Sequence, residues 1–228
     1  MAKKGGSSHL KRISSFRALR VPKKTHEWLI KACPGPHKLE SSIPLGVLVR
    51  DYLGLSSSSR ETKFILNHGE VFVDGRRIKS PGFPVGLMDV VTLPKVGKGY
   101  RIGIDNHERL TINEVTPDEA KAKLCKVRSK VKVSKGKIML GLHDGKSVPG
   151  DSNYGVGDSV KLTLPENKIE KLLKLIPGAR CLIVKGKHAG KLCTLKELRM
   201  VGNRKYEAHV DAEGTSFITS KPCLFVVE

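Results

Sequence analysis

The sequence predicts an α+β fold of several modules: a helix–hairpin domain, a central small β-barrel-like domain and a C-terminal small barrel. Helical spacing gives way to a hairpin pattern between residues 60 and 78. Short alternating segments with frequent turns follow in residues 126–164, and more strands flank a glycine-bounded loop in residues 178–227. A length of 228 residues accommodates one large domain or two to three small ones.

The charge of the chain favours an anionic partner. Lysine and arginine number 42 against 22 aspartates and glutamates, which gives a formal charge of +20. Such a balance attracts polyanions, most often nucleic acid, with an anionic membrane surface as the alternative. No apolar run approaches the roughly 18 residues that span a bilayer, and the N-terminus lacks the apolar core of a secretory signal. We expect a soluble cytoplasmic protein with no membrane partner.

The cysteines and aromatic residues indicate how the chain does and does not bind a partner. The five cysteines stand singly, without a Cys-x-x-Cys pair, so we expect reduced thiols, no metal site and no cofactor. The cysteines are Cys33, Cys125, Cys181, Cys193 and Cys223. Aromatic residues make up only 5% of the chain, which favours backbone and shape contacts to folded nucleic acid over base stacking.

Residues 1–42 are expected to form a basic N-terminal arm. Its first 38 residues carry ten lysines and arginines against Glu27 alone, so it should order only against a polyanion. A disordered tail or a targeting signal is the alternative, although Trp28 and the Cys33–His37 bend argue against pure disorder. The arm's candidate nucleic-acid contacts are Lys3, Lys4, Lys11, Arg12, Arg17, Arg20, Lys23 and Lys24.

Residues 43–105 form the predicted helix–hairpin domain. An apolar stripe predicts a helix over 43–55 with Pro44 in its first turn, packed on the apolar face of a second helix. The stripe is Leu45, Leu48, Val49, Tyr52 and Leu53, and the facing residues are Thr62, Ile65 and Leu66. A strand at 89–93 should close the unit, and residues 95–105 should be a mobile basic connector.

The second helix and its hairpin carry the strongest local signals. Serines precede Arg60, Gly69 suits the position after the last turn, and Asp74-Gly75 is a two-residue hairpin turn. One helix face and the returning strand are cationic, which suits a phosphate backbone. The candidate contacts there are Arg60, Lys63, Arg76, Arg77 and Lys79.

Residues 106–175 form the predicted central domain. A capping box at 116–119 predicts a helix through Leu124. Alternation then predicts a strand with Val127, Val131 and Val133 inward. Its outward row would be Lys126, Arg128, Lys130 and Lys132. A hairpin at Asp144-Gly145 and a strand at 157–164 follow, and residues 169–176 read as a short helix or an irregular linker.

Residues 176–228 form the predicted C-terminal barrel. A loop bounded by Gly186 and Gly190 lets backbone N–H groups approach phosphates closely. It is not a Walker A loop, because Leu192 stands where a serine or threonine is required. The candidate contacts in this loop are Lys185, Lys187, His188 and Lys191. Strands near 206–210, 216–218 and 224–227 would complete the barrel.

These motifs together resemble a known family. Arg60 and Gly69-Glu70-Val71-Phe72-Val73-Asp74-Gly75 resemble the S-four-type (S4) RNA-binding domain, and the 186–190 loop resembles a KOW motif, although Cys193 stands where a third glycine is usual. Their order, with the 9–12 start and the Pro34–His37 run, resembles the S-four-e (S4e) ribosomal proteins of archaea and eukaryotes.

The resemblance implies a structural protein of the small ribosomal subunit that binds small-subunit rRNA and contacts neighbouring ribosomal proteins, with an SH3-like KOW barrel at its C-terminus. Its lysines and arginines would reach phosphates and 2′-hydroxyls with little base readout, along a continuous positive track. Two alternatives stay open: an RNA-modifying enzyme, and a transcription or translation factor that binds protein through the last barrel. The carboxylates available to an enzyme show no catalytic grouping with a nucleophile; they are Asp118, Glu119, Asp144, Asp151 and Asp158. We therefore expect no catalytic residues.

Overall fold

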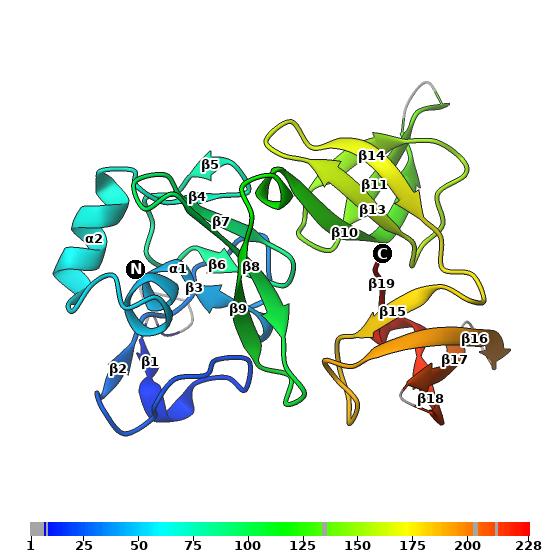
Figure 1. Cartoon of the computed structure of the whole chain (residues 1–228), viewed down its shortest axis with the longest axis horizontal. Coiled ribbons are helices and arrows are strands. Elements are labelled where there is room, and N and C mark those ends of the chain that lie inside the picture. The colour runs from blue at the N-terminus through cyan, green and yellow to red at the C-terminus, as the bar shows by residue number, and fades with distance from the viewer. Residues whose placement is uncertain (1–6, 8, 134–135, 203–204, 213) are drawn as a thin grey trace, which may run out of the picture.

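The computed structural model describes residues 7, 9–133, 136–202, 205–212 and 214–228. Three bodies are visible in Figure 1. The N-terminal segment and the helix–hairpin sheet lie together on the left, a central sheet lies at the upper right, and the C-terminal sheet lies below it. Each body has its own cluster of buried apolar side chains.

The first five-stranded sheet has the order β5-β4-β7-β8-β9. Its strands are β4 (Phe72–Val73), β5 (Arg76–Arg77), β7 (Val90–Leu93), β8 (Lys98–Ile104) and β9 (Leu110–Val115). The expected mobile connector at 95–105 is wrong, because β8 pairs with both β7 and β9 and buries Tyr100 and Ile102. The sheet therefore runs past the boundary expected at residue 105.

Two short helical elements cover this sheet. α2 (Ser59–Asn67) has the expected N-cap, since Ser58 accepts a hydrogen bond from the Glu61 N–H, and Gly69 is left-handed with φ 73°. The helix expected over 43–55 is shorter. It consists of α1 (Leu45–Val47) and a π-helical segment (Leu48–Tyr52). Pro44 is extended and belongs to a strand pair, β3 (Ile43–Pro44) with β6 (Pro84–Val85), so it precedes the first turn.

The N-terminal segment is folded onto the first sheet rather than held open for a polyanion. β1 (Leu10–Lys11) pairs with β2 (Trp28–Leu29), and the short 3-10 turns Arg12–Ser14 and Leu39–Ser41 punctuate the segment. Ala18, Leu19, Val21 and Leu29 lie in the same buried cluster as the helices. The expectation that this arm orders only against a polyanion is wrong, because these spaced apolar residues reach a core that lies outside the arm.

The central sheet has the order β12-β11-β10-β13-β14. Its strands are β10 (Ala122–Lys132), β11 (Ile138–Leu142), β12 (Ser147–Gly150), β13 (Ser159–Thr163) and β14 (Lys168–Leu173). The capping box at Thr116 and Glu119 forms but leads into a single 3-10 turn, Glu119–Lys121, so the helix expected through Leu124 is wrong. The Asp144-Gly145 hairpin is confirmed between β11 and β12.

Two bulges in this sheet explain two wrong expectations. Ile169 and Leu172 have helical spacing, but a register shift in the β13–β14 pair lets both face the core from one strand. A shift between Val127 and Ser129 places Lys130 opposite the buried Leu140 and leaves Val131 exposed. After the bulge the alternation of inward and outward side chains is reversed, so Val131 faces solvent and Lys130 faces the side of Leu140. The four cations of β10 therefore do not form one row.

The C-terminal sheet has the order β18-β17-β16-β15-β19. Its strands are β15 (Arg180–Ile183), β16 (Leu192–Val201), β17 (Lys205–Ala212), β18 (Thr215–Ser220) and β19 (Leu224–Val226), with a 3-10 turn at Lys221–Cys223. The expected strands are confirmed. In both the central and the C-terminal sheet the described pairs leave two edge strands, so closure into barrels stays a prediction.

Candidate nucleic-acid interface

α2 and the β4–β5 hairpin present exposed cations on one part of the first body. The exposed residues are Arg60, Lys63, Arg76, Arg77 and Lys79. The Nη2 atom of Arg77 donates to the backbone carbonyl of Asn67 at 3.0 Å, so the hairpin is tied to the last turn of α2. Gly69 lies between them with φ 73°, which favours glycine, and a Cβ there would displace the Arg77 guanidinium, whose Nε lies 1.7 Å from the Cβ position. Helix and hairpin therefore hold their cations side by side.

The cations of the N-terminal segment divide into exposed and buried. Lys3 and Lys4 lie outside the described residues. The exposed ones are Lys11, Arg17, Arg20, Lys23 and Lys24. Arg12 is 1% exposed, donates from Nε to the carbonyl of Pro22 and pairs with Asp51 at 3.5 Å, so it serves the fold and is not available to a polyanion.

The β10 cations also have different surroundings. The Nζ atom of Lys126 donates to the backbone carbonyls of Pro222 and Leu224, at 2.9 and 2.6 Å, and burial lowers the pKa of this lysine to about 8. Lys126 therefore links the central sheet to the C-terminal sheet. Arg128 and Lys132 are exposed, and half-buried Lys130 donates to the carbonyl of Ser152.

The glycine-bounded loop of the C-terminal body packs on the turn between β8 and β9. The Gly186 N–H donates to Oε1 of Glu108 at 2.5 Å, a backbone donor that was expected to face phosphate. Lys185 and Lys187 are exposed, whereas half-buried His188 and Lys191 lie closer to the protein. The ring of His188 stacks on Phe217 with centroids 4.0 Å apart.

Gly190 provides a test of this packing. Its φ is +78°, and a Cβ would lie 2.5 Å from the carbonyl carbon of Asp105. Gly186→Ala is the matched control, because Gly186 also has positive φ but has nothing within 4 Å of its Cβ position. We expect Gly186→Ala to cost about 1 to 2 kcal/mol of backbone strain, and Gly190→Ala to cost at least about 1 kcal/mol more in urea unfolding. Equal losses would contradict the close approach.

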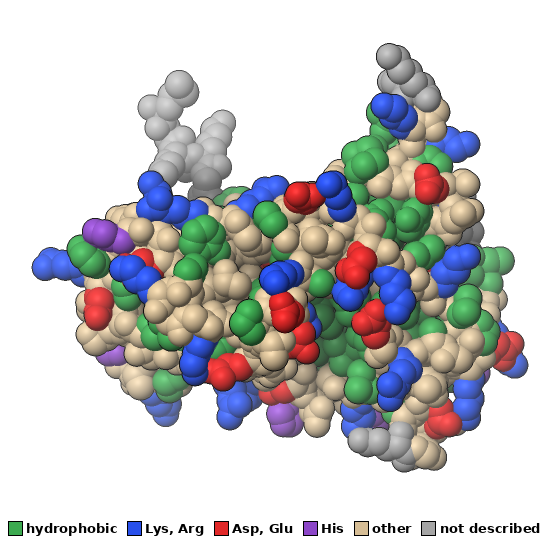
Figure 2. Space-filling view, turned by 45° about the horizontal axis from the view of Figure 1, so that its top comes forward, with side chains coloured by type: hydrophobic (Ala, Val, Ile, Leu, Met, Phe, Trp, Pro, Cys, Tyr) green, Lys and Arg blue, Asp and Glu red, His purple; other side chains and the backbone are tan. Residues whose placement is uncertain are grey.

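A cleft between the bodies gathers cations from distant parts of the sequence. Those lining it are Arg17, Lys38, Lys126, Arg128, Lys185 and Lys221. Lys38 and Lys221 were not among the residues predicted to bind; nothing local distinguishes them, since the fold alone brings them to the cleft. Glu40, Glu108 and Glu207 line it too. On the face shown in Figure 2, lysines and arginines occur over every body with carboxylates between them, rather than as one unbroken track.

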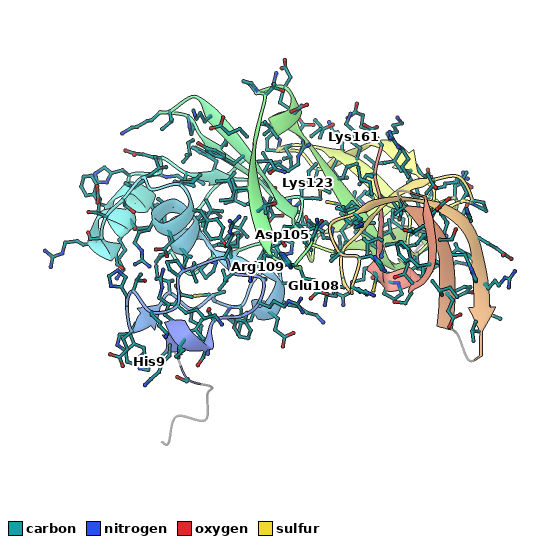
Figure 3. All side chains as sticks on the ribbon, turned by 60° about the horizontal axis from the view of Figure 1, so that its bottom comes forward. His9, Asp105, Glu108, Arg109, Lys123 and Lys161 are labelled. Carbon is teal, nitrogen blue, oxygen red and sulfur yellow. The ribbon has the colours of Figure 1, made fainter. Side chains whose placement is uncertain are left out.

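A buried ionic cluster joins the first body to the central sheet. Nζ of Lys123 lies 2.8 Å from Asp74, 2.5 Å from Asp89 and 3.0 Å from Asp144. Lys146 adds a second ammonium at 2.9 Å from Asp74, and His37 lies 2.9 Å from Asp89. Figure 3 shows Lys123 at the junction of the two bodies. The sequence offered one clue to this role of Lys123. It alternates with Cys125 and Val127, which are both buried, so a lysine occupies an inward-facing position of the strand.

The charges in this cluster stabilise one another. Burial works to lower the pKa of Lys123, but Asp89 and Asp74 outweigh it and hold that pKa well above its usual value. Burial likewise works to raise the pKa of Asp89 and Asp144, yet the Lys123 ammonium holds both below their usual values. Lys123, Asp89 and Asp144 are therefore charged at neutral pH, and the cluster holds two bodies together.

His143, beside this cluster, predicts a pH effect. Burial lowers its pKa to about 4, its Nε2 lies 3.1 Å from the Leu87 carbonyl, and its Nδ1 accepts the Lys126 N–H. The unfolded chain, with a pKa near 6.5, binds the proton first as pH falls, so stability is lost from about pH 6.5 down to pH 4. This histidine should account for about 2 kcal/mol of the loss between pH 7 and pH 5.

The check compares urea unfolding at pH 7 and pH 5. In His143→Gln the loss on acidification should be smaller than in the wild type by about 2 kcal/mol. His26→Gln removes an exposed histidine and should acidify like the wild type. An unchanged loss in His143→Gln would contradict the role given to this ring.

The described residues do not favour a metal or catalytic reading of this region. Cys125, His143 and Asp144 lie within ligand distance of one another, but both His143 nitrogens are hydrogen-bonded and Asp144 holds Lys123. Asp158 accepts the backbone N–H groups of Gly155 and Leu175. Asp144 and Asp158 were possible catalytic carboxylates on the sequence alone. In the structure Asp158 stabilises a turn, and Asp144 stabilises a turn and the junction between two bodies. In the same described part, no helix has the length and apolar character to cross a membrane.

Comparisons with known proteins match the whole length of the chain. The model of the ribosomal family S4e matches residues 96–169, that of the S4 domain residues 47–91, and that of the RS4NT domain residues 4–40. Small ribosomal subunit protein eS4 of Methanothermobacter thermautotrophicus is 36% identical over 229 residues, covering 100% of this chain and 95% of the relative. The protein of the same name from Archaeoglobus fulgidus is 40% identical over 220 residues, covering 96% and 92%.

A solved structure agrees with these matches. The crystal structure of the 30S ribosomal protein S4e from Thermoplasma acidophilum has a TM-score of 0.72 and 33% sequence identity. The superposition covers 82% of this chain and 95% of the Thermoplasma acidophilum chain.

Proposed function

Since the chain belongs to the ribosomal family S4e, we infer that it is a structural constituent of the small ribosomal subunit, where it supports translation in the cytoplasm. The observation that carries this conclusion is the match along the chain to proteins named small ribosomal subunit protein eS4, at 36% and 40% identity. The family is one of ribosomal proteins rather than enzymes, and we propose that this chain likewise has no catalytic activity.

Its binding partner is folded small-subunit rRNA, held through phosphates and shape. The support is the S4 domain match together with the exposed cations of α2, the hairpin and the N-terminal segment. Arginine and lysine side chains on a rigid helix and hairpin fix the position of an RNA backbone without reading its sequence. Arg12 and Lys126 are left out of the proposed interface because Arg12 is buried and half-buried Lys126 points its Nζ at carbonyls of the C-terminal body.

The remaining assignments follow the same proposal. Arg128 and Lys185, which line the cleft, and the exposed Lys132 and Lys187 supply further phosphate contacts. Lys130, His188 and Lys191 have a smaller share because they are half-buried. β15–β19 form an SH3-like KOW barrel, supported by the positive φ of Gly186 and Gly190. The domain limits proposed are 1–42, 43–105, 106–175 and 176–228, with β9 completing the sheet of the second. Neighbouring ribosomal proteins contact the faces that RNA leaves free.

Retention in the subunit tests this function. Small subunits assembled with the chain are washed at increasing salt, and the bound fraction is measured. An integral component stays bound under washes that remove loosely associated factors. Loss of the chain in the first moderate wash would instead indicate a transient translation factor, the alternative that the sequence left open. Crosslinks from the chain to rRNA in the washed subunits would confirm its RNA contacts.

A further inference from the structure

α2 carries an exposed aromatic residue in the middle of its cationic face. The Phe64 side chain is 61% exposed, although burial of such a ring would stabilise the fold. Its ring lies 4.0 Å from that of His68, with 36° between the two planes. Nδ1 of His68 is 2.9 Å from the Phe64 carbonyl, which fixes the second ring against the helix. The pair is therefore an ordered aromatic surface that faces solvent.

The surroundings of this pair are cationic. Helical spacing places Arg60 one turn before Phe64, and Lys63 and Asn67 on the neighbouring rows. Arg77 reaches the last turn of α2 at the Asn67 carbonyl. The one carboxylate on this helix, that of Glu61, is engaged by the N–H and the hydroxyl of Ser57. Figure 2 shows hydrophobic, histidine and cationic side chains gathered at the end of the molecule that carries α2.

We infer that Phe64 and His68 form a stacking platform for one unpaired nucleobase of the small-subunit rRNA, a role that rests on the proposed function. A base presents a π-face to an aromatic ring whatever its identity, and stacking strengthens binding by roughly 5- to 150-fold per base. Arg60 and Lys63 hold the phosphates on either side of that base. A protein partner fits this site less well, because Phe64 is the one exposed large apolar side chain of α2 (Ser59–Asn67) and cations flank it.

The arrangement refines the expectation drawn from composition. A 5% aromatic content argues against a protein that binds RNA mainly by stacking. One ring placed among phosphate-binding residues needs no general enrichment, because it selects a single unpaired base within a contact that is otherwise electrostatic.

The first experiment separates stacking from charge by the salt dependence of binding. Full-length Phe64→Ala should bind small-subunit rRNA about tenfold more weakly at every salt concentration, with the log–log slope unchanged. Phe64→Trp should bind like the wild type. Lys63→Gln should flatten the slope by about 0.7–0.9. The control is Met200→Ala, which removes another side chain that is 65% exposed but lies in the C-terminal sheet, and it should have no effect.

The second experiment reports the stacked base directly. Trp28 is the only tryptophan, so Trp28→Phe combined with Phe64→Trp places a single fluorophore on the platform. Its emission should be quenched by rRNA but not by inorganic polyphosphate, which has the charge without bases. Quenching by both polymers, or by neither, would overturn the platform.

The two proposals fail differently. If Phe64→Ala binds like the wild type while Lys63→Gln flattens the slope, the platform is wrong and the proposed rRNA contact stands. If both variants bind like the wild type with unchanged slopes, the α2 face does not contact rRNA, and both the platform and this part of the proposed function are overturned.

Discussion

Replacement of Lys123 by methionine is expected to lower the free energy of unfolding by about 3–5 kcal/mol, the range measured when one partner of a buried ion pair is removed. Lys123 holds Asp74, Asp89 and Asp144 with an Nζ that is fully buried. Methionine fills a similar volume but leaves these carboxylates without their shared cation. Lys146 still reaches Asp74 and Asp144, so Asp89 loses most and keeps His37 and the Gly86 backbone N–H as partners.

Urea unfolding followed by Trp28 fluorescence and by circular dichroism measures this loss. Lys121→Met is the matched control two residues earlier, because its ion pair with Asp118 is exposed, and such pairs are worth about 0–1 kcal/mol. Losses of the same size in the two variants would show that the buried cluster does not hold the two bodies together.

The second large effect concerns rRNA affinity. Neutralising Arg60, Lys63, Arg76 and Arg77 together to glutamine should weaken binding by about three orders of magnitude at ~0.1 M salt, because each lost phosphate contact costs about 0.7–0.9 decade there. These side chains are exposed, so the fold should survive, which thermal unfolding checks. Equilibrium filter binding to small-subunit rRNA measures the affinity.

The control for this variant removes the same charge elsewhere. Lys98, Lys121, Lys168 and Arg199 are each paired with a carboxylate, so converting all four to glutamine changes the net charge equally. We expect the affinity for rRNA to fall tenfold or less, because cations that are already paired with a carboxylate neutralise fewer phosphates and so release fewer counterions from the RNA. Equal losses in the two variants would mean that overall charge, and not the α2–hairpin face, governs binding.

The helix–hairpin could be predicted from sequence because its signals are local. The Ser58 cap, the Gly69 stop and the Asp74-Gly75 turn each act within a few residues, and the structure has all three. The exposed cations of this unit follow directly from its helical and strand periods. Its neighbour β8 was missed because glycines and lysines read as a connector, although its pairing partners β7 and β9 directly precede and follow it in the chain.

The wrong predictions share one physical cause, which is that contacts made from outside a segment override the pattern within it. A bulge gave β14 the spacing of a helix, and another turned Val131 outward. Arg12 looked like one more cation of a basic arm, but Asp51 and the Pro22 carbonyl enclose it. Lys123 was hidden for the same reason, since two of its three carboxylates belong to another sheet.

A salt titration of full-length chain binding to small-subunit rRNA tests the account most directly. The account predicts a straight line of log affinity against log salt with a slope steeper than about −4, corresponding to at least five or six neutralised phosphates. A flat line, with affinity unchanged between low and moderate salt, would contradict the claim that the excess cations of this chain act on a folded RNA.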